Sequence, residues 1–461
     1  MTGARPTHSE TARQWVHVGS GLFALLLRVL TGPQAAAMAV GALAFNIVLL
    51  PRLGGRQLYR PIDHQRGFPL GIVLYPLAVL LLVLAFPSRL DIAAAAWGIL
   101  AFGDGFATLA GRLRTSAGRS RTDETAEVPS GRLPWNTDKS VAGTLAFIVC
   151  GGAGAVALAW WVRPSLTPLP PMVFTIAAPL VAAVLAGLVE TIPIRLDDNI
   201  SVPLTAALVL WLASLMTPES LDLSRGRVLT ALPWALAINA FTGWLGYRAR
   251  TVSKSGYAGG VLVGTIIYIG GGAGAWVLLF VTFLIASITS RLGLKSKEQL
   301  GIAEERGGRR GAGNAIANCG IAAIGAIAAA TTPFAPAALT ALVAALVAGG
   351  SDTVASEIGK AWGRSTFLVT TLRRVKAGTP GAMSLEGTVA GLLAAVALAS
   401  AGAALGLIPA STIVIVVVAA TAGALVESAL GATLEGPGIL NNDMLNFINT
   451  AVAAVVALAL L

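Results

Sequence analysis

Apolar stretches long enough to cross a lipid bilayer recur along the whole chain, with no soluble domain between them. Hydrophobic residues occupy 55% of the 461 positions and charged residues only 12%. A helix of roughly 17–25 apolar residues spans a bilayer. The sequence therefore predicts an all-α, polytopic integral membrane protein with about 15 transmembrane helices. These helices are expected near residues 17–31, 34–51, 68–86, 91–111, 140–161, 172–193, 199–217, 228–246, 256–271, 274–290, 312–331, 335–351, 384–405, 407–430 and 447–461.

Polar residues recur in the same order in the two halves of the chain. The first half carries Gly103-Asp104-Gly105, Lys139-Ser140, Gly143-Thr144, Glu190 and Asp197-Asp198-Asn199. The second half carries Ser351-Asp352-Thr353, Ser384, Gly387-Thr388, Glu427 and Asn441-Asn442-Asp443. Carboxylates in lipid-embedded segments are costly, so two sets in matching order indicate two related polar sites. We expect one chemical centre in each half.

Basic residues gather in short loops, around residues 52–66, 112–132, 248–254, 291–310 and 360–376. Such loops face the cytoplasm in most membrane proteins, so the net charge of +10 is read as a topology signal and no nucleic-acid partner is expected. With a cytoplasmic amino terminus, all five loops lie inside. The matching motifs of the two halves are then separated by eight crossings, which makes the duplication parallel and unlike the inverted repeats of many transporters.

The orientation places most polar motifs at the cytoplasmic membrane boundary, where a soluble nucleotide meets a lipid-dissolved substrate. We expect two domains, residues 1–247 and 248–461, with Leu221–Arg227 as the other candidate division.

The acidic and amide residues are suited to Mg²⁺, which takes oxygen ligands and usually shares them with substrate phosphates. The first-half donors are Asp104, Glu190, Asp197, Asp198 and Asn199, and the second-half donors are Asp352, Glu357, Glu427, Asn441, Asn442 and Asp443. Phosphoryl transfer also needs cations for the developing charge. Candidates are Lys139 in the first half and Arg306, Arg309, Arg310, Arg373, Arg374 and Lys376 in the second, with Asn314 as a polar contact.

Other chemistries find less support in the sequence. Gly359-Lys360 is followed by Ala361, so no P-loop motif is present. Three histidines in the whole chain disfavour histidine-based metal chemistry. Each single carboxylate has an ordinary alternative role as a helix cap or as a partner of a loop arginine, and the ordered recurrence of the whole set is what favours a functional reading.

The first half resembles the phytol kinase and dolichol kinase group, which is itself similar to CDP-diacylglycerol synthases. The matching pieces are Arg13-x-x-x-His17-x-x-x-Gly21, Gly103-Asp104-Gly105, Ala110-Gly111-Arg112, Lys139-Ser140-x-x-Gly143, and Glu190 leading to Asp198-Asn199 with Val202-Pro203. Gln14 and Ala142 depart from the usual pattern of that group.

The second half resembles the phytyl-phosphate kinase family. The matching pieces are Lys254-Ser255-Gly256, Arg306-Gly307 and Arg309-Arg310, Ala317-Asn318, Ser351-Asp352-Thr353-x-x-Ser356-Glu357-x-Gly359, Val375-x-x-Gly378-Thr379, Ser384-x-x-Gly387 and Asn442-Asp443-x-x-Asn446. Glu427-Ser428 stands where that family typically has an Asp-Ser pair.

Together the resemblances imply a fused pair of consecutive kinases in a bacterial cytoplasmic membrane. The first half would phosphorylate an isoprenoid alcohol such as phytol or geranylgeraniol with CTP and Mg²⁺, and the second would convert the monophosphate to the diphosphate. The implied catalytic residues are Asp104, Lys139, Glu190, Asp352, Glu357 and Glu427, and the implied metal ligands are Asp104, Asp197, Asp198, Asp352, Asn442 and Asp443. The implied nucleotide and phosphate contacts are Ser140, Asn199, Arg309, Arg310, Asn314, Arg373, Arg374, Lys376 and Ser384.

Three alternatives stay open from the sequence. A CDP-lipid-forming cytidylyltransferase would use related motifs and the same nucleotide but release pyrophosphate. A transporter or lipid flippase would show repeats and buried carboxylates near the bilayer centre. A single-activity kinase would have one active half and one scaffold half.

Overall fold

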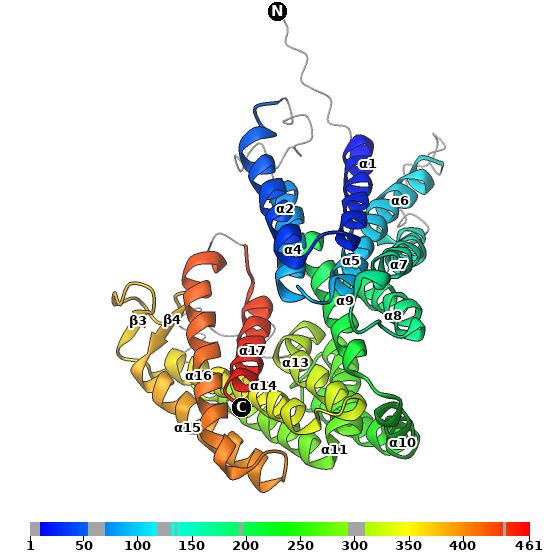
Figure 1. Cartoon of the computed structure of the whole chain (residues 1–461). Coiled ribbons are helices and arrows are strands. Elements are labelled where there is room, and N and C mark those ends of the chain that lie inside the picture. Colours follow the sequence, from blue (N-terminus) through cyan, green and yellow to red (C-terminus); the bar gives the residue numbers. More distant parts are fainter. Residues whose placement is uncertain are drawn as a thin grey trace, which may run out of the picture. The chain divides into compact units, whose positions relative to one another are not determined.

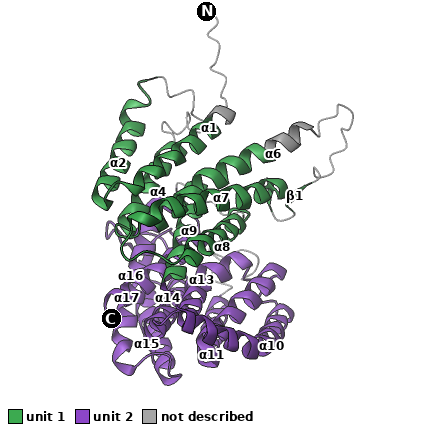
Figure 2. Ribbon diagram, turned by 45° about the vertical axis from the view of Figure 1, so that its right-hand side comes forward, with its two compact units in different colours: residues 1–214 green, residues 215–461 purple. Residues whose placement is uncertain are grey.

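The computed structural model describes residues 10–53, 70–117, 131–133, 136–192, 197–293, 309–436 and 439–461. Within these residues the chain is helical apart from two short antiparallel strand pairs (Figure 1). The expected all-α membrane fold is therefore confirmed. The chain divides into two compact units, Met1–Ser214 and Leu215–Leu461 (Figure 2).

The first unit is built around one buried helix. Its elements are α1 (Glu10–Ser20), η1 (Gly21–Arg28), α2 (Gly32–Ala44), η2 (Phe45–Leu49), α4 (Leu70–Ala85), α5 (Leu90–Gly98), η4 (Ile99–Asp104), α6 (Gly105–Ala117), β1 (Arg132–Leu133), β2 (Asn136–Ser140), α7 (Val141–Val162), η5 (Arg163–Ser165), α8 (Met172–Glu190) and α9 (Asp198–Leu215). Every residue of α5 is buried. Its alanine run and Gly98 present little side-chain bulk, so α7 packs close to the backbone at Ala155.

The second unit also surrounds a central helix. Its elements are α10 (Pro218–Arg248), α11 (Lys254–Arg291), α13 (Ala312–Thr331), α14 (Ala335–Trp362), β3 (Thr366–Leu368), β4 (Ala382–Ser384), α15 (Leu385–Ala404), η7 (Ala410–Thr412), α16 (Ile413–Leu430), η8 (Gly431–Glu435) and α17 (Asn442–Ala459). The stretch 340–351 of α14 is buried without interruption, and α11, α13, α15, α16 and α17 all pack on this helix.

Helix α11 is a hairpin of two antiparallel segments. Gly272 interrupts it with a φ of 79°, a conformation that glycine adopts without strain. A straight helix of 38 residues would be about 57 Å long, yet Gly256 and Ala286, near its two ends, line the same cavity. The sequence expectation of separate segments at 256–271 and 274–290 agrees with this break.

Twelve helices in the described ranges are long and apolar enough to span a membrane, and the hairpin of α11 is one of them. Helix α4 is apolar but shorter, and α1 with η1 is outside this set. The expected total of about 15 spans therefore stays a prediction.

The boundary between the two units lies earlier in the sequence than the expected division at 247/248. Helix α10 packs on α11 and α13, and so belongs to the second unit. Its contacts include a hydrogen bond from Trp276 Nε1 to Asn239 Oδ1 at 2.9 Å and one from Ser220 Oγ to the Thr331 carbonyl at 2.5 Å. The division at Ser214 lies closer to the other candidate, Leu221–Arg227.

Candidate functional site

Three carboxylates of the first unit converge: two stand at helix ends, and Asp104 stands within the continuous helical run Leu90–Gly111. Asp104 ends η4, Glu190 ends α8, and Asp198 begins α9. One oxygen from each lies within 4.8 Å of the others. Glu190 is buried, whereas Asp104 and Asp198 are partly exposed. The structure thus brings together three residues that stand far apart in the sequence and that the motif order had grouped.

Lys139 joins this acidic cluster from strand β2. Its Nζ donates hydrogen bonds to Glu190 Oε1 at 2.6 Å and to Asp198 Oδ2 at 2.9 Å. Burial alone would lower the pKa of the Lys139 ammonium, but the charges of Glu190 and Asp198 outweigh burial and hold this pKa above its ordinary value. The site therefore keeps a positive charge beside its carboxylates.

Two other first-half candidates act as helix caps. Ser140 caps α7, and its Oγ accepts a hydrogen bond from the Gly143 N–H at 3.1 Å. Asp197 Oδ1 accepts from the Asn199 backbone N–H at 3.0 Å and from Asn199 Nδ2 at 2.7 Å. These contacts fix the starts of α7 and α9, and so position Lys139 and Asp198. Their assignment to nucleotide or metal stays a prediction.

His17 is a contact of Asp104 that the residue assignments did not include, although the family motif contained it. Its Nε2 lies 3.5 Å from Asp104 Oδ2 and 3.1 Å from the Leu100 carbonyl. Residues 99–104 form a π-helical turn, and such turns recur at functional sites. Gly21, four residues after His17, has no side chain, so the helical segment that follows His17 approaches Ala101 closely.

The second unit holds its own group of carboxyl side chains. Those of Asp352 on α14 and Glu427 on α16 interact electrostatically with each other. Asn449 of α17 lies beside Glu427 and is 1% exposed. Among the described residues, neither polar atom of its amide has a hydrogen-bond partner, and Glu427 Oε2 has none. Buried polar atoms without partners are uncommon and are typical of a place that takes an ion, water or ligand.

The cation of this second group comes from the same helix as Asp352. Lys360 Nζ donates to Glu357 Oε1 at 3.3 Å, and its charge acts on both Asp352 and Glu435. Sequence reasoning placed Lys360 in a loop, because the apolar run of α14 ends near residue 351. The helix continues to Trp362, which keeps Asp352, Glu357 and Lys360 on one helical segment. Lys360, Glu435 and Asn449 are therefore site neighbours that the sequence assignments missed.

The remaining second-half candidates differ in their contacts and exposure. Asp443 lies against Gly313 at the start of α13, while Asn442 and Arg309 are exposed. Arg310 and Asn314 line a cavity, described below. Ser384 caps α15 by accepting from the Gly387 N–H at 3.0 Å.

Arg373, Arg374 and Lys376 are exposed on the connection between β3 and β4. Gly381, near its end, contacts Ser428 and Ala432. The connection is therefore anchored close to Glu427.

The local packing around the two aspartates follows the same pattern. Gly143 packs against the carbonyl of Ala107, three residues after Asp104, and Gly387 packs against the carbonyl of Ala355, three residues after Asp352.

The glycines seven residues after each aspartate, Gly111 and Gly359, lie against the capping serines Ser140 and Ser384. A short strand pair leads into each cap. These shared contacts support the expected duplication.

The donor set of the first unit fits a divalent cation. Asp104, Glu190 and Asp198 supply carboxylate oxygens, the ligand type that Mg²⁺ prefers. The Asn199 Oδ1 atom is buried and has no hydrogen-bond partner within the described ranges. Lys139 already neutralises part of this charge, so a bound cation would share Glu190 and Asp198 with it or displace it.

Residues 237–454 match the family described as integral membrane protein DUF92. The chain is 39% identical over 237 residues to an uncharacterized membrane protein of Synechocystis sp., an alignment that covers 50% of this chain and 92% of the relative. It is 39% identical over 214 residues to the chloroplastic protein VTE6 of Arabidopsis thaliana, covering 45% of this chain and 64% of that protein.

It is also 28% identical over 227 residues to probable phytol kinase 2, chloroplastic, of Glycine max, covering 46% of this chain and 68% of the relative. No solved structure matches the chain.

Proposed function

The chain belongs to the DUF92 family of integral membrane proteins, and we propose that it phosphorylates an isoprenoid alcohol twice, to the monophosphate and then to the diphosphate. CTP is the proposed phosphate donor and Mg²⁺ the proposed cofactor. The observation that carries the proposal is that each unit gathers carboxyl groups and a lysine near the ends of membrane helices. Similarity to a protein named probable phytol kinase supports both the reaction class and the substrate class.

The position of the acidic clusters suits a reaction between a soluble and a membrane-dissolved substrate. Glu190 is the last residue of its candidate span and Asp198 the first of the next. In the second unit, the carboxyl-terminal part of α14 and the start of α15 meet through Gly387 and Ala355. Transport sites typically lie near the bilayer midplane. The positions of Glu190 and Asp198 therefore favour chemistry at the membrane surface.

In the first step, the alcohol oxygen forms a bond to the γ-phosphorus of CTP, and the bond from that phosphorus to the bridging oxygen of the departing CDP breaks. Asp104, next to the span interior, is the proposed acceptor of the hydroxyl proton. Lys139 is the proposed contact for the nucleotide phosphates, where its charge opposes the negative charge that gathers on them. A bound Mg²⁺ would neutralise phosphate charge, held by Asp198 and Glu190 with Asp104.

In the second step, an oxygen of the isoprenoid monophosphate attacks the γ-phosphorus of a second CTP, and CDP leaves again. The monophosphate oxygen is already ionised near neutral pH, so this step needs charge neutralisation more than a base. Asp352, Glu427 and Asp443 are the proposed metal ligands, with Asn442 and Glu357 beside them. Arg309, Arg310, Arg373, Arg374 and Lys376 are the proposed phosphate contacts, with Lys360 added by its position in the structure.

A long hydrocarbon tail keeps the intermediate in the membrane, so the monophosphate reaches the second site by lateral diffusion. We propose that both sites face the cytoplasm, on the side of the basic loops.

The test is to supply purified full chain in detergent with phytol, Mg²⁺ and each nucleoside triphosphate in turn. We expect phytyl monophosphate, then phytyl diphosphate, with CDP released. Release of pyrophosphate and a CDP-lipid product would instead identify a cytidylyltransferase.

A further inference from the structure

The second unit encloses a cavity of about 140 Å³ between α10, the hairpin of α11, α13 and α14. Its wall is largely apolar and aromatic, with Tyr257, Trp276, Phe280 and Phe283 among the lining residues. Apolar cavities with a few convergent polar groups are typical ligand sites.

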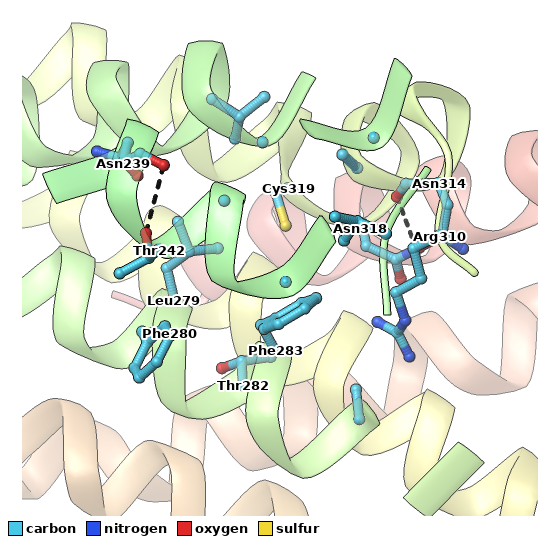
Figure 3. Close-up of a pocket in the computed structure, with 18 of the residues that line it drawn as sticks. Asn239, Thr242, Leu279, Phe280, Thr282, Phe283, Arg310, Asn314, Asn318 and Cys319 are labelled. Carbon is cyan, nitrogen blue, oxygen red and sulfur yellow. Dashed lines mark hydrogen bonds between the residues drawn. The ribbon is translucent and has the colours of Figure 1, made fainter. Parts of the chain in front are cut away.

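One end of the cavity is polar. Arg310, Asn314 and Asn318 gather there, and Asn239 and Thr242 lie on the opposite side (Figure 3). The backbone of Arg310 is held by hydrogen bonds with Thr251 and Ser253, each at 3.0 Å.

Arg310 stands two residues before the start of α13. A guanidinium and an amide beside a helix amino terminus are groups that bind a phosphate.

The polar end adjoins the acidic residues of the second unit. Gly349 and Gly350 line the cavity, and Asp352 follows Gly350 by two residues on α14. Asp443 lies against Gly313, the neighbour of Asn314. A phosphate at Arg310 would therefore lie near carboxylates suited to hold a metal.

Three glycines line one side of the cavity. Gly243 and Gly246 of α10 and Gly260 of α11 line it, and Gly260 is exposed. A side chain added at Gly260 would meet no atom within 4 Å. These positions lie within candidate spans.

We propose that this cavity binds the isoprenoid monophosphate, with its phosphate at Arg310 and Asn314 and its tail along Tyr257, Trp276 and Phe283. The identity of the lipid rests on the proposed function. The assignment adds a tail-binding site that the acidic clusters do not define.

The test is equilibrium binding of radiolabelled phytyl monophosphate to the full chain in nanodiscs, without nucleotide. Gly260→Leu adds a side chain at an open position that lines the cavity, and Gly226→Leu is the matched control, since Gly226 lies on α10 outside the cavity and is also open. Both changes favour the helix. We expect Gly260→Leu to weaken binding at least roughly tenfold and Gly226→Leu to leave it unchanged.

Arg310→Gln should weaken binding of phytyl monophosphate but not of phytol, and saturating inorganic phosphate should not displace the lipid. Unchanged binding by folded Gly260→Leu, or displacement by phosphate alone, would overturn the tail site.

A prenyl phosphate with a diazirine at the far end of its chain gives a second readout on the unmodified protein. Cross-links on the cavity-lining parts of α10, α11, α13 or α14 are expected, and cross-links confined to helices outside the cavity would overturn the proposal. Since no phosphate transfer is involved, a failed kinase assay leaves both binding results interpretable.

Discussion

The Lys139 ammonium lies 2.6 Å from the Glu190 carboxylate, although 51 residues separate them in the sequence. Strand β2 carries Lys139 to the end of α8, and the Ser140 cap fixes the start of α7 directly after it. A change at Lys139 is therefore expected to affect both the proposed nucleotide contact and the stability of the first unit.

Lys139→Met should lower both stability and the first reaction step. It leaves the buried Glu190 carboxylate without its cation, at a cost of about 1–3 kcal/mol. Adding Glu190→Gln should restore part of the thermal midpoint but not the activity. Thermal unfolding in detergent and phytol phosphorylation measure the two effects, and a Lys139→Met protein with unchanged midpoint and turnover would contradict this role.

The ion pair should persist through neutral and moderately alkaline pH. The raised pKa of Lys139 means that its contribution to stability is complete below the ordinary lysine pKa of about 10.4 and is lost only as the pH rises through the higher folded value. The thermal midpoint of Lys139→Met should therefore stay below that of the wild type at every pH between about 7 and 9. A difference that vanishes within this window would contradict the raised pKa.

Asp198→Asn should increase the Mg²⁺ concentration needed for phytol phosphorylation, by roughly tenfold or more, because it removes a charged oxygen ligand. Asp138→Asn is the matched control, since Asp138 is exposed on β2 next to Lys139 and outside the carboxylate cluster. Activity is titrated with Mg²⁺ after chelation of the purified protein. Equal requirements in the two variants would show that Asp198 does not hold the metal.

His17→Ala should reduce the turnover of the first step by roughly tenfold with little change in KM, because His17 orients Asp104 and is not proposed to contact the alcohol. The second step, assayed in the same sample with added monophosphate, serves as the control and should be unaffected. A fall in both steps would indicate general damage to the fold, and an unchanged first step would remove His17 from the site.

Much of the membrane architecture was predictable because long apolar runs permit few alternatives. The break at Gly272 was also predictable from the sequence, since glycines separate two apolar runs there. The end of α14 was not, because helix formers such as Glu357 and Lys360 extend it beyond the apolar run. In α14, the apolar run marks the end of the continuously buried stretch, whereas the helix itself continues to Trp362.

The candidate site was predictable as a set of residues but not as an arrangement. Order in the sequence grouped Asp104, Glu190 and Asp198, and the structure brings these three together. The sequence order could not distinguish Asp198, which contacts Lys139, from Asp197, which caps α9. The two side chains point in different directions because a shift of one residue at a helix start redirects the side chain. Lys360 was missed because it was assigned to a basic loop, and Asn449 because it lies outside the motifs that were compared.

The most direct test of two separate centres is a comparison of Asp104→Asn and Asp352→Asn in the purified full chain, with phytol or phytyl monophosphate as the starting lipid. Each change keeps the size of the side chain while removing its charge. We predict that Asp104→Asn stops monophosphate formation yet converts added monophosphate to diphosphate, and that Asp352→Asn accumulates monophosphate. Equal loss of both steps in both folded variants would contradict the account.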